Sequence, residues 1–122
     1  DWQKRGAQNA PGKNFYHSGS IGPWMVTTDE IPDPSVLTIA TRLNDAVMQE
    51  GSTDMMIYNI PFLISYFSQM TWLEPGDIIA TGSPSGSGGS RDPQVWLKSG
   101  DRLEAEISQI GTLRNTVENQ PS

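Results

Sequence analysis

The sequence of 122 residues contains no cysteine, and this absence excludes several kinds of chemistry. Disulfide bonds, cysteine-based zinc sites, iron–sulfur clusters and thiol nucleophiles all need cysteine side chains. The chain also has no run of about 18 apolar residues, which a membrane-spanning helix would need. Because no charged-then-apolar leader is visible and the lack of cysteine suits a reducing compartment, we expect a cytoplasmic protein without a membrane partner.

Basic residues and histidine are scarce. Eight Lys and Arg stand against 14 Asp and Glu, which gives a formal net charge of −6. An acidic chain is repelled by a phosphate backbone, so we expect no nucleic-acid partner. His17 is the only histidine, and no serine or acid is marked in the sequence as its partner in a catalytic triad.

Glycine and proline are abundant, with 12 and 9 residues, and favour short strands and turns. Residues 55–69 carry the one convincing helical pattern, with Asn59 as a cap and Pro61 in the first turn. Asn44-Asp45 predicts the tight turn of a hairpin. Segments of strand-like composition are 21–28, 36–43, 46–49, 78–81, 102–107 and 110–117.

These patterns predict one domain over residues 1–122 that is mostly β, and mixed α/β by content. We expect at least five strands in an antiparallel roll, sandwich or barrel, and one main helix. Residues 1–20 are polar and glycine-rich and predict an irregular segment. Residues 118–122 predict a frayed tail.

Three features could carry chemistry, and each has a plain alternative. The glycine-rich loop 82–90 lacks the spacing of a nucleotide-binding loop; it is either a mobile surface loop or a backbone cradle for a small carboxylate. Glu104 and Glu106 share a strand face that is either solvated or metal-binding. Lys13 is a surface lysine, or an electrophilic clamp beside a small anion.

Short motifs follow one another along nearly the whole chain. They are Asp1-Trp2-Gln3, Gly12-Lys13-Asn14-Phe15, 21–34, Asn44 with Gln49, 52–58, 73–84, Gly100-Asp101 and 110–115. In this order they resemble the C-terminal half of the fumarylacetoacetate hydrolase family. Arg91-Asp92-Pro93 and Trp96-Leu97-Lys98 are similar to a subgroup that includes decarboxylases of the homoprotocatechuate pathway and related 2-oxo-acid enzymes.

This resemblance implies a mixed β-roll, a homodimer and a divalent metal. Hard ions such as Mg²⁺, Mn²⁺ or Ca²⁺ would be held by carboxylates. The implied activity is a C–C bond hydrolase or decarboxylase. Its substrates would be 2-oxo acids, acylpyruvates or β-diketo acids in the catabolism of aromatic or small carboxylic compounds. Asp1 stands where a Met would start a chain, and we expect the residues to be the C-terminal portion of a longer catalytic domain.

The resemblance also implies roles for three residues. Gln3 would hydrogen-bond a substrate oxygen, Lys13 would be catalytic by neutralising carboxylate or enolate charge, and Ser83 would donate a hydroxyl where relatives more often carry Thr. The family's metal ligands match no residue of this chain and would lie upstream of it. Tyr16 and His17 stand where relatives often have Asp and Thr, which weakens any second cation site.

A different function is also open. The 122 residues could be a truncated family member that has lost catalysis and serves as a homodimeric binding or structural module. Such a chain would have to cover the sheet surface that the absent half leaves exposed.

Overall fold

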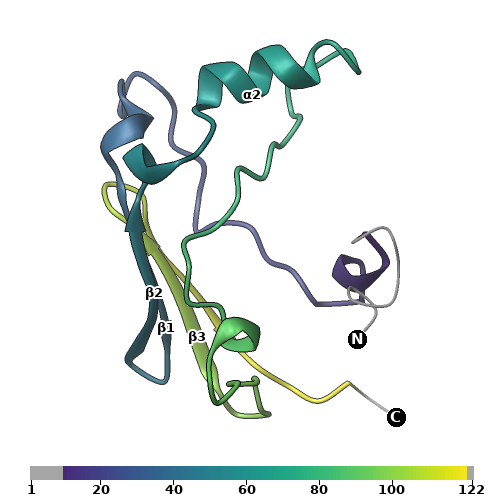
Figure 1. Cartoon of the computed structure of the whole chain (residues 1–122), viewed down its shortest axis with the longest axis vertical. Coiled ribbons are helices and arrows are strands. Elements are labelled where there is room, and N and C mark those ends of the chain that lie inside the picture. Colours follow the sequence, from purple (N-terminus) through teal and green to yellow (C-terminus); the bar gives the residue numbers. More distant parts are fainter. Residues whose placement is uncertain (1–9, 121–122) are drawn as a thin grey trace.

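The computed structural model describes residues 10–120, whose regular structure is one antiparallel sheet and one α-helix. The sheet has the strand order β2-β1-β3-β4. Its strands are β1 (Thr38–Leu43), β2 (Ala46–Ser52), β3 (Arg102–Ile107) and β4 (Gly111–Thr116), and the helix is α2 (Ile60–Phe67). Figure 1 shows α2 beyond one end of the sheet, with long irregular segments between them. The prediction of a mostly β fold with one helix is confirmed.

The hairpin between β1 and β2 forms where the sequence predicts it. Asn44 and Asp45 both have positive φ, at 49° and 71°, as a two-residue type I′ turn requires. The Asn44 side chain also joins the turn to the start of β3, because its Oδ1 accepts the Arg102 N–H at 2.9 Å. The partner strand runs on past Gln49 to Ser52, so it is longer than predicted.

The helix is shorter than predicted. The Asn59 Oδ1 accepts the Phe62 N–H at 2.9 Å, which caps the first turn of α2. Pro61 disfavours helical backbone in the residue before it, so the helix cannot extend far upstream. Within the predicted range 55–69, the residues before Asn59 form instead the end of a 3₁₀ turn, η3 (Thr53–Met55), and a bend.

Two predicted strands are wrong. Residues 21–28 and 78–81 have no strand structure, and no strand in the described part of the chain pairs with them. Their side chains lie open: Ile21 is 82% exposed, Met25 89% and Ile78 71%. Alternation and β-propensity report how well a segment would suit a sheet, but a ladder also needs a partner strand.

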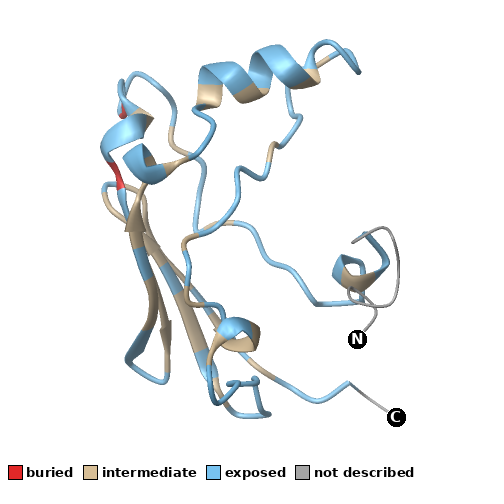
Figure 2. Cartoon of the chain, viewed as in Figure 1, coloured by how far each residue is buried: buried red, intermediate tan, exposed pale blue. Residues whose placement is uncertain are grey.

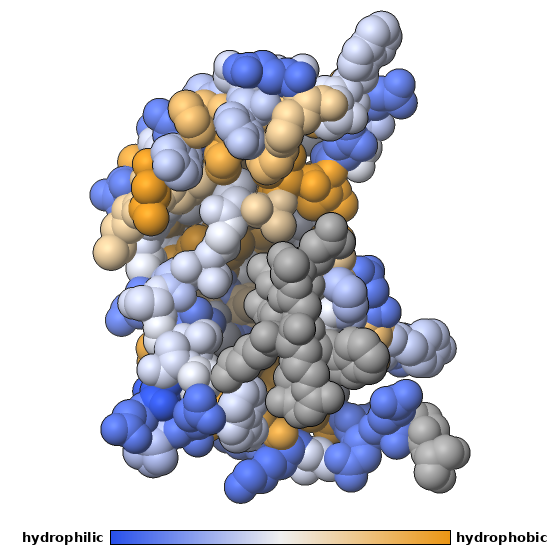
Figure 3. All heavy atoms as spheres, turned by 45° about the vertical axis from the view of Figure 1, so that its right-hand side comes forward, coloured by the Kyte–Doolittle hydropathy of each residue, from blue (hydrophilic) through white to orange (hydrophobic). Residues whose placement is uncertain are grey.

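Very little of the described structure forms a core. Its buried hydrophobic residues are Ile31 and Leu37, at 7% and 4% exposed. Figure 2 shows that most other residues of the sheet are half-buried and that α2 and the connecting segments are largely exposed. Figure 3 shows apolar side chains gathered towards the upper part of one face. Residues 10–120 therefore carry more apolar surface than they bury among themselves.

Candidate functional site

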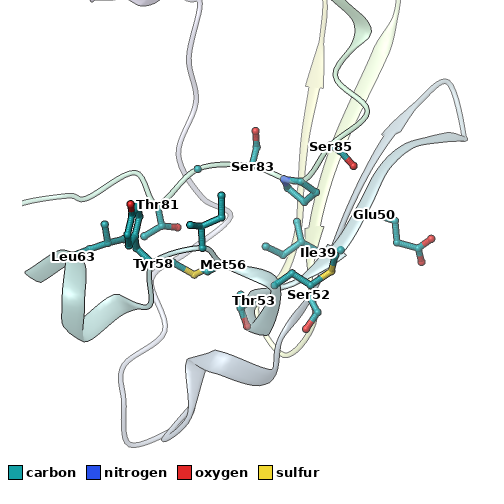
Figure 4. A pocket seen from close by; sticks show the side chains of 15 residues that line it. Ile39, Glu50, Ser52, Thr53, Met56, Tyr58, Leu63, Thr81, Ser83 and Ser85 are labelled. Atoms are coloured by element: carbon teal, nitrogen blue, oxygen red, sulfur yellow. The ribbon is translucent and has the colours of Figure 1, made fainter. Parts of the chain in front are cut away.

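A cavity of about 460 Å³ lies between the β1–β2 end of the sheet, η3 and the beginning of α2. The segment 81–85 crosses one side of it, and Ile39 of β1 and Leu63 of α2 contribute to its walls. Figure 4 shows the labelled residues around it. The lining residues are Ile39, Glu50, Gly51, Ser52, Thr53, Met55, Met56, Ile57, Tyr58, Leu63, Thr81, Gly82, Ser83, Pro84 and Ser85. This size and mixture of apolar walls with a few polar groups is typical of a small-molecule site.

The hydroxyl groups around the cavity differ in how they are used. Thr53 Oγ1 accepts the Leu37 N–H at 2.9 Å, and its own hydroxyl hydrogen can reach the Leu37 carbonyl at 3.3 Å, so it ties η3 to the sheet. Ser83 Oγ has no hydrogen-bond partner within residues 10–120. Of these two hydroxyl groups, that of Ser83 is the one left for a ligand, and Figure 4 shows its oxygen directed away from the other labelled side chains.

The charged group at the cavity does not face into it. Glu50 is the charged residue among the described lining residues. Figure 4 shows its carboxylate directed away from the other labelled side chains. The cavity therefore offers hydroxyl and backbone groups to a ligand, and a cation for an anionic ligand has to come from elsewhere.

The backbone of the segment 81–85 is held against β2. Gln49 Nε2 donates to the Pro84 carbonyl over 2.6 Å. A Cβ on Gly51 would lie 3.2 Å from the Pro84 ring, so the absence of a side chain there lets the two segments approach. Gly82 has a φ of 104°, which favours glycine, and it sets the direction in which Ser83 follows.

The structure does not bring the predicted site residues together. Lys13 is exposed at the end of η1 (Ala10–Lys13) and does not line the cavity. In Figure 1, η1 lies well away from the sheet. Gln3 falls outside the described residues. Of the three, Ser83 lines the cavity, and the roles of Gln3, Lys13 and Ser83 all stay predictions.

His17 and Tyr16 lie close to one another. Their rings stack with centroids 3.9 Å apart, and both residues are exposed. His17 has a φ of 54°. Neither residue lines the cavity, so the described structure gives this pair no contact with it.

The acidic pair on β3 is engaged in cross-strand ion pairs. Arg114 Nε lies 2.8 Å from Glu104 Oε1, and Arg42 pairs with Glu106. Within residues 10–120, no three His, Cys, Asp or Glu side chains gather where they could hold a metal ion. The described residues alone therefore do not fit a divalent metal site, and Glu104 and Glu106 serve the charged face of the sheet.

Three carboxylates have lowered pKa values, and all three brace turns. The Thr27 hydroxyl lowers the pKa of Asp29, and the Ser35 hydroxyl and N–H lower that of Asp33. Asn44 and the Lys98 N–H lower the pKa of Asp101. None of these aspartates lines the cavity. Their hydrogen bonds account for the shifts without a catalytic role.

Residues 10–120 thus combine an antiparallel sheet, one α-helix and a cavity lined in part by hydroxyl-bearing residues. Residues 1–118 match the family model described as the fumarylacetoacetate (FAA) hydrolase C-terminal domain. The chain therefore belongs to the fumarylacetoacetate hydrolase family.

Relatives in this family include a tautomerase and hydrolases. The chain is 43% identical over 119 residues to the mitochondrial oxaloacetate tautomerase FAHD2A of Bos taurus, covering 96% of this chain and 38% of that protein. The fumarylacetoacetate hydrolase of Exiguobacterium antarcticum is 38% identical with a TM-score of 0.92, over 98% of this chain and 43% of that one. The fold is therefore that of the family.

A third relative carries a ligand. The maleylpyruvate hydrolase from Sphingobium sp. SYK-6, solved in complex with manganese(II) and pyruvate, is 35% identical with a TM-score of 0.71, over 81% of this chain and 35% of that one. The chain thus spans about 40% of the length of the first relatives it matches. In the described part of the chain, no helix is long and apolar enough to cross a membrane.

Proposed function

We propose that the chain is the C-terminal portion of the catalytic domain of a divalent-metal-dependent enzyme. The enzyme would hydrolyse or decarboxylate 2-oxo acids, acylpyruvates or β-diketo acids in the catabolism of aromatic or small carboxylic compounds. The family match over residues 1–118 supports the class, and the relative that holds manganese and pyruvate supports a 2-oxo-acid ligand. The proposed metal is Mg²⁺, Mn²⁺ or Ca²⁺, with ligands that lie upstream of this chain.

The observation that carries the proposal is a cavity lined by hydroxyl groups without partners among residues 10–120, those of Ser52, Thr81, Ser83 and Ser85. Ser83 is the one for which the family resemblance implies a substrate contact. A carboxylate or 2-oxo group accepts hydrogen bonds, and Ser83 Oγ can donate one. The segment that carries Ser83 is braced on β2 through Pro84, so the donor is held in place before a ligand arrives. A donor placed in advance costs little reorganisation when the substrate binds.

Lys13 supplies the positive charge that the cavity wall lacks. In this proposal the Lys13 ammonium approaches the bound substrate and neutralises its carboxylate. It also stabilises the negative charge on the enolate oxygen that is left when the C–C bond breaks. Gln3 contributes a hydrogen bond to a substrate oxygen. The Lys13 contact requires η1 to lie nearer the cavity when substrate is bound.

The test is turnover by the complete protein with Mg²⁺ or Mn²⁺, assayed on oxaloacetate and on acylpyruvates such as maleylpyruvate. Lys13→Ala is expected to lower kcat by about 10²-fold, as loss of one transition-state donor does. Lys98→Ala is the matched control, because this exposed lysine lies in a turn held by its backbone N–H. If Lys13→Ala turns over every active substrate at the parental rate, the proposed catalytic role is wrong.

A second candidate function is a homodimeric binding or structural module without catalysis. The observation in its favour is the exposed apolar surface, including Trp72 at 92% and Phe62 at 48% exposed. This function predicts that the protein made in the cell forms dimers but turns over no 2-oxo acid at any metal concentration. Metal-dependent turnover with the native gene product would exclude it.

A further inference from the structure

A bulge in β2 leaves one backbone carbonyl outside the sheet ladder. Thr41 pairs with Gln49 and Arg42 pairs with Val47, so Met48 has no residue opposite it. The extra residue of a β-bulge loses its place in the ladder. The Met48 carbonyl instead accepts a hydrogen bond from the guanidinium group of Arg91.

Arg91 joins this carbonyl to the segment that follows Ser83. While one terminal nitrogen binds the Met48 carbonyl, Nε donates to the Gly86 carbonyl over 3.0 Å. The side chain is half-buried. A guanidinium group presents its donors in a rigid planar fork, so it fixes the two backbone segments relative to one another.

Gln49 makes a second attachment one residue beyond the bulge. Gln49 binds the Pro84 carbonyl and Arg91 binds the Gly86 carbonyl. The backbone is therefore held at Pro84 and at Gly86, just after Ser83. A Cβ on Gly86 would lie 2.6 Å from the Met48 oxygen, and its φ is 96°. The close approach therefore requires glycine, and the contact between the bulge and this segment is built into the sequence.

We propose that Gln49 and Arg91 are positioning residues for the Ser83 hydroxyl. They hold the backbone of 84–86 on the β2 bulge and so fix where that hydroxyl meets the substrate. Neither side chain lines the cavity that Ser83 borders, so both act through the backbone rather than on substrate. This inference rests on the function proposed above for Ser83.

The expected kinetic signature is a change in KM. The hydrogen bonds of Gln49 and Arg91 to this segment are called the clamp. When the clamp is weakened, only a fraction of the protein holds Ser83 in place, and the apparent affinity for substrate falls by that fraction. Bound substrate then pulls the segment back into position, so the chemical step changes little. In the complete, metal-loaded protein, Arg91→Met is expected to raise KM about tenfold and to leave kcat within about twofold.

The specificity of the effect is tested against Ser83→Ala. If Arg91 acts through Ser83, Arg91→Met changes KM little once Ser83 is alanine, because coupled residues are not additive. Arg91→Lys is expected to recover part of the loss, since one ammonium can reach one of the two carbonyls. Gln49→Met, which removes only the amide donor, is expected to raise KM in the same way and covers the case in which the arginine variants do not fold.

Amide hydrogen exchange measures how firmly this segment is held and does not depend on enzyme activity. Arg91→Met is expected to speed exchange at the amides of Ser90 and Val95, whose N–H groups donate to the Ser87 and Gly88 carbonyls of the loop that Arg91 holds, and to leave β3 and β4 unchanged. Arg114→Met is the control, because this arginine binds Glu104 on the charged face of the sheet. Parental exchange at Ser90 and Val95 in both Arg91→Met and Gln49→Met overturns the proposal that Arg91 and Gln49 hold this segment.

The remaining outcomes separate the two proposals. Additive effects of Arg91→Met and Ser83→Ala on KM overturn the positioning role even if Ser83 itself matters. A Ser83→Ala variant with parental KM and kcat contradicts the proposed use of Ser83 in the function. It also overturns the positioning role, whatever exchange shows.

Discussion

Ser83 is the residue on which the structure and the proposed function meet. Ser83 lines the cavity, and its hydroxyl has no partner in the described part of the chain. Removing an unpartnered hydroxyl changes the stability of the fold little, so its loss should mainly weaken substrate binding. Ser83→Ala is expected to raise KM for 2-oxo-acid substrates about tenfold, and Ser83→Thr to keep KM near the parental value.

The measurement is steady-state kinetics of the complete protein, with thermal unfolding as the check on folding. Ser99→Ala is the matched control, because Ser99 is an exposed serine that does not line the cavity. Equal KM values for Ser83→Ala and the parental protein would remove Ser83 from the site.

Asp101 gives the fold a pH dependence whose direction follows from its contacts. The Asn44 side chain donates to Asp101 Oδ1 at 2.8 Å and the Lys98 N–H donates to Oδ2 at 2.7 Å, and both bonds favour the ionised carboxylate. They lower the folded pKa below the unfolded value of about 3.9. The stabilisation is therefore complete above the unfolded pKa and is lost as pH falls through the folded one.

Asp101→Asn should remove this pH dependence. The difference in urea midpoint between the parental protein and Asp101→Asn is expected to be largest near neutral pH and to shrink below about pH 4. Urea titrations from acidic to neutral pH measure it. A difference that stays constant across this range would show that the ionised form of Asp101 gains nothing from these bonds.

The residue contacts that hold Ser83 could not be predicted from the sequence. Ser83 and Lys13 were found through motif resemblance, and the structure places the first at a cavity but leaves the second away from it. Arg91 reaches Met48 because a bulge opens a carbonyl in a strand far from it in the chain. The one local signal was Gly86, whose φ is 96°, and glycine alone does not say what it approaches.

At the scale of elements, the local signals succeeded and the non-local ones failed. The hairpin at Asn44-Asp45 and the strand 102–107 depend on turn chemistry and alternation that lie within a few residues, and both were predicted correctly. The strands expected at 21–28 and 78–81 needed partners that the described residues do not supply. The sequence therefore predicts correctly the elements that nearby residues stabilise, and it fails for strands that need a partner distant in the chain.

The helix cap offers a test at this scale. Asn59 satisfies one of the open N–H groups of α2, and α2 has no fully buried residue to stabilise it otherwise. Asn59→Ala is expected to cost about 1 kcal/mol of helix stability and Asn59→Asp close to nothing. Hydrogen exchange at the amides of 62–64 measures the loss locally, and equal protection in Asn59→Ala and Asn59→Asp would contradict the cap's importance.

At the scale of the whole molecule, the exposed area exceeds what a chain of this mass should show. The 13.4 kDa chain exposes 10055 Å², whereas a folded monomer of that mass exposes about 6,500 Å². Part of the excess is apolar, because Trp72 and Ile57 are each 92% exposed. Large exposed apolar surfaces mark contacts with another protein surface, either a second copy or the rest of a longer domain.

This surface predicts how the 122 residues behave alone. At neutral pH they are expected to self-associate as concentration rises from about 1 to 100 µM, because burying apolar area yields about 25 cal/mol per Å². Sedimentation velocity measures the species. Trp72→Ser should shift association to higher concentration, while Val47→Thr on the hairpin, which replaces a smaller and half-exposed side chain, should shift it less. A chain that stays monomeric over this range, with its sheet intact by circular dichroism, would show that these side chains need no covering surface.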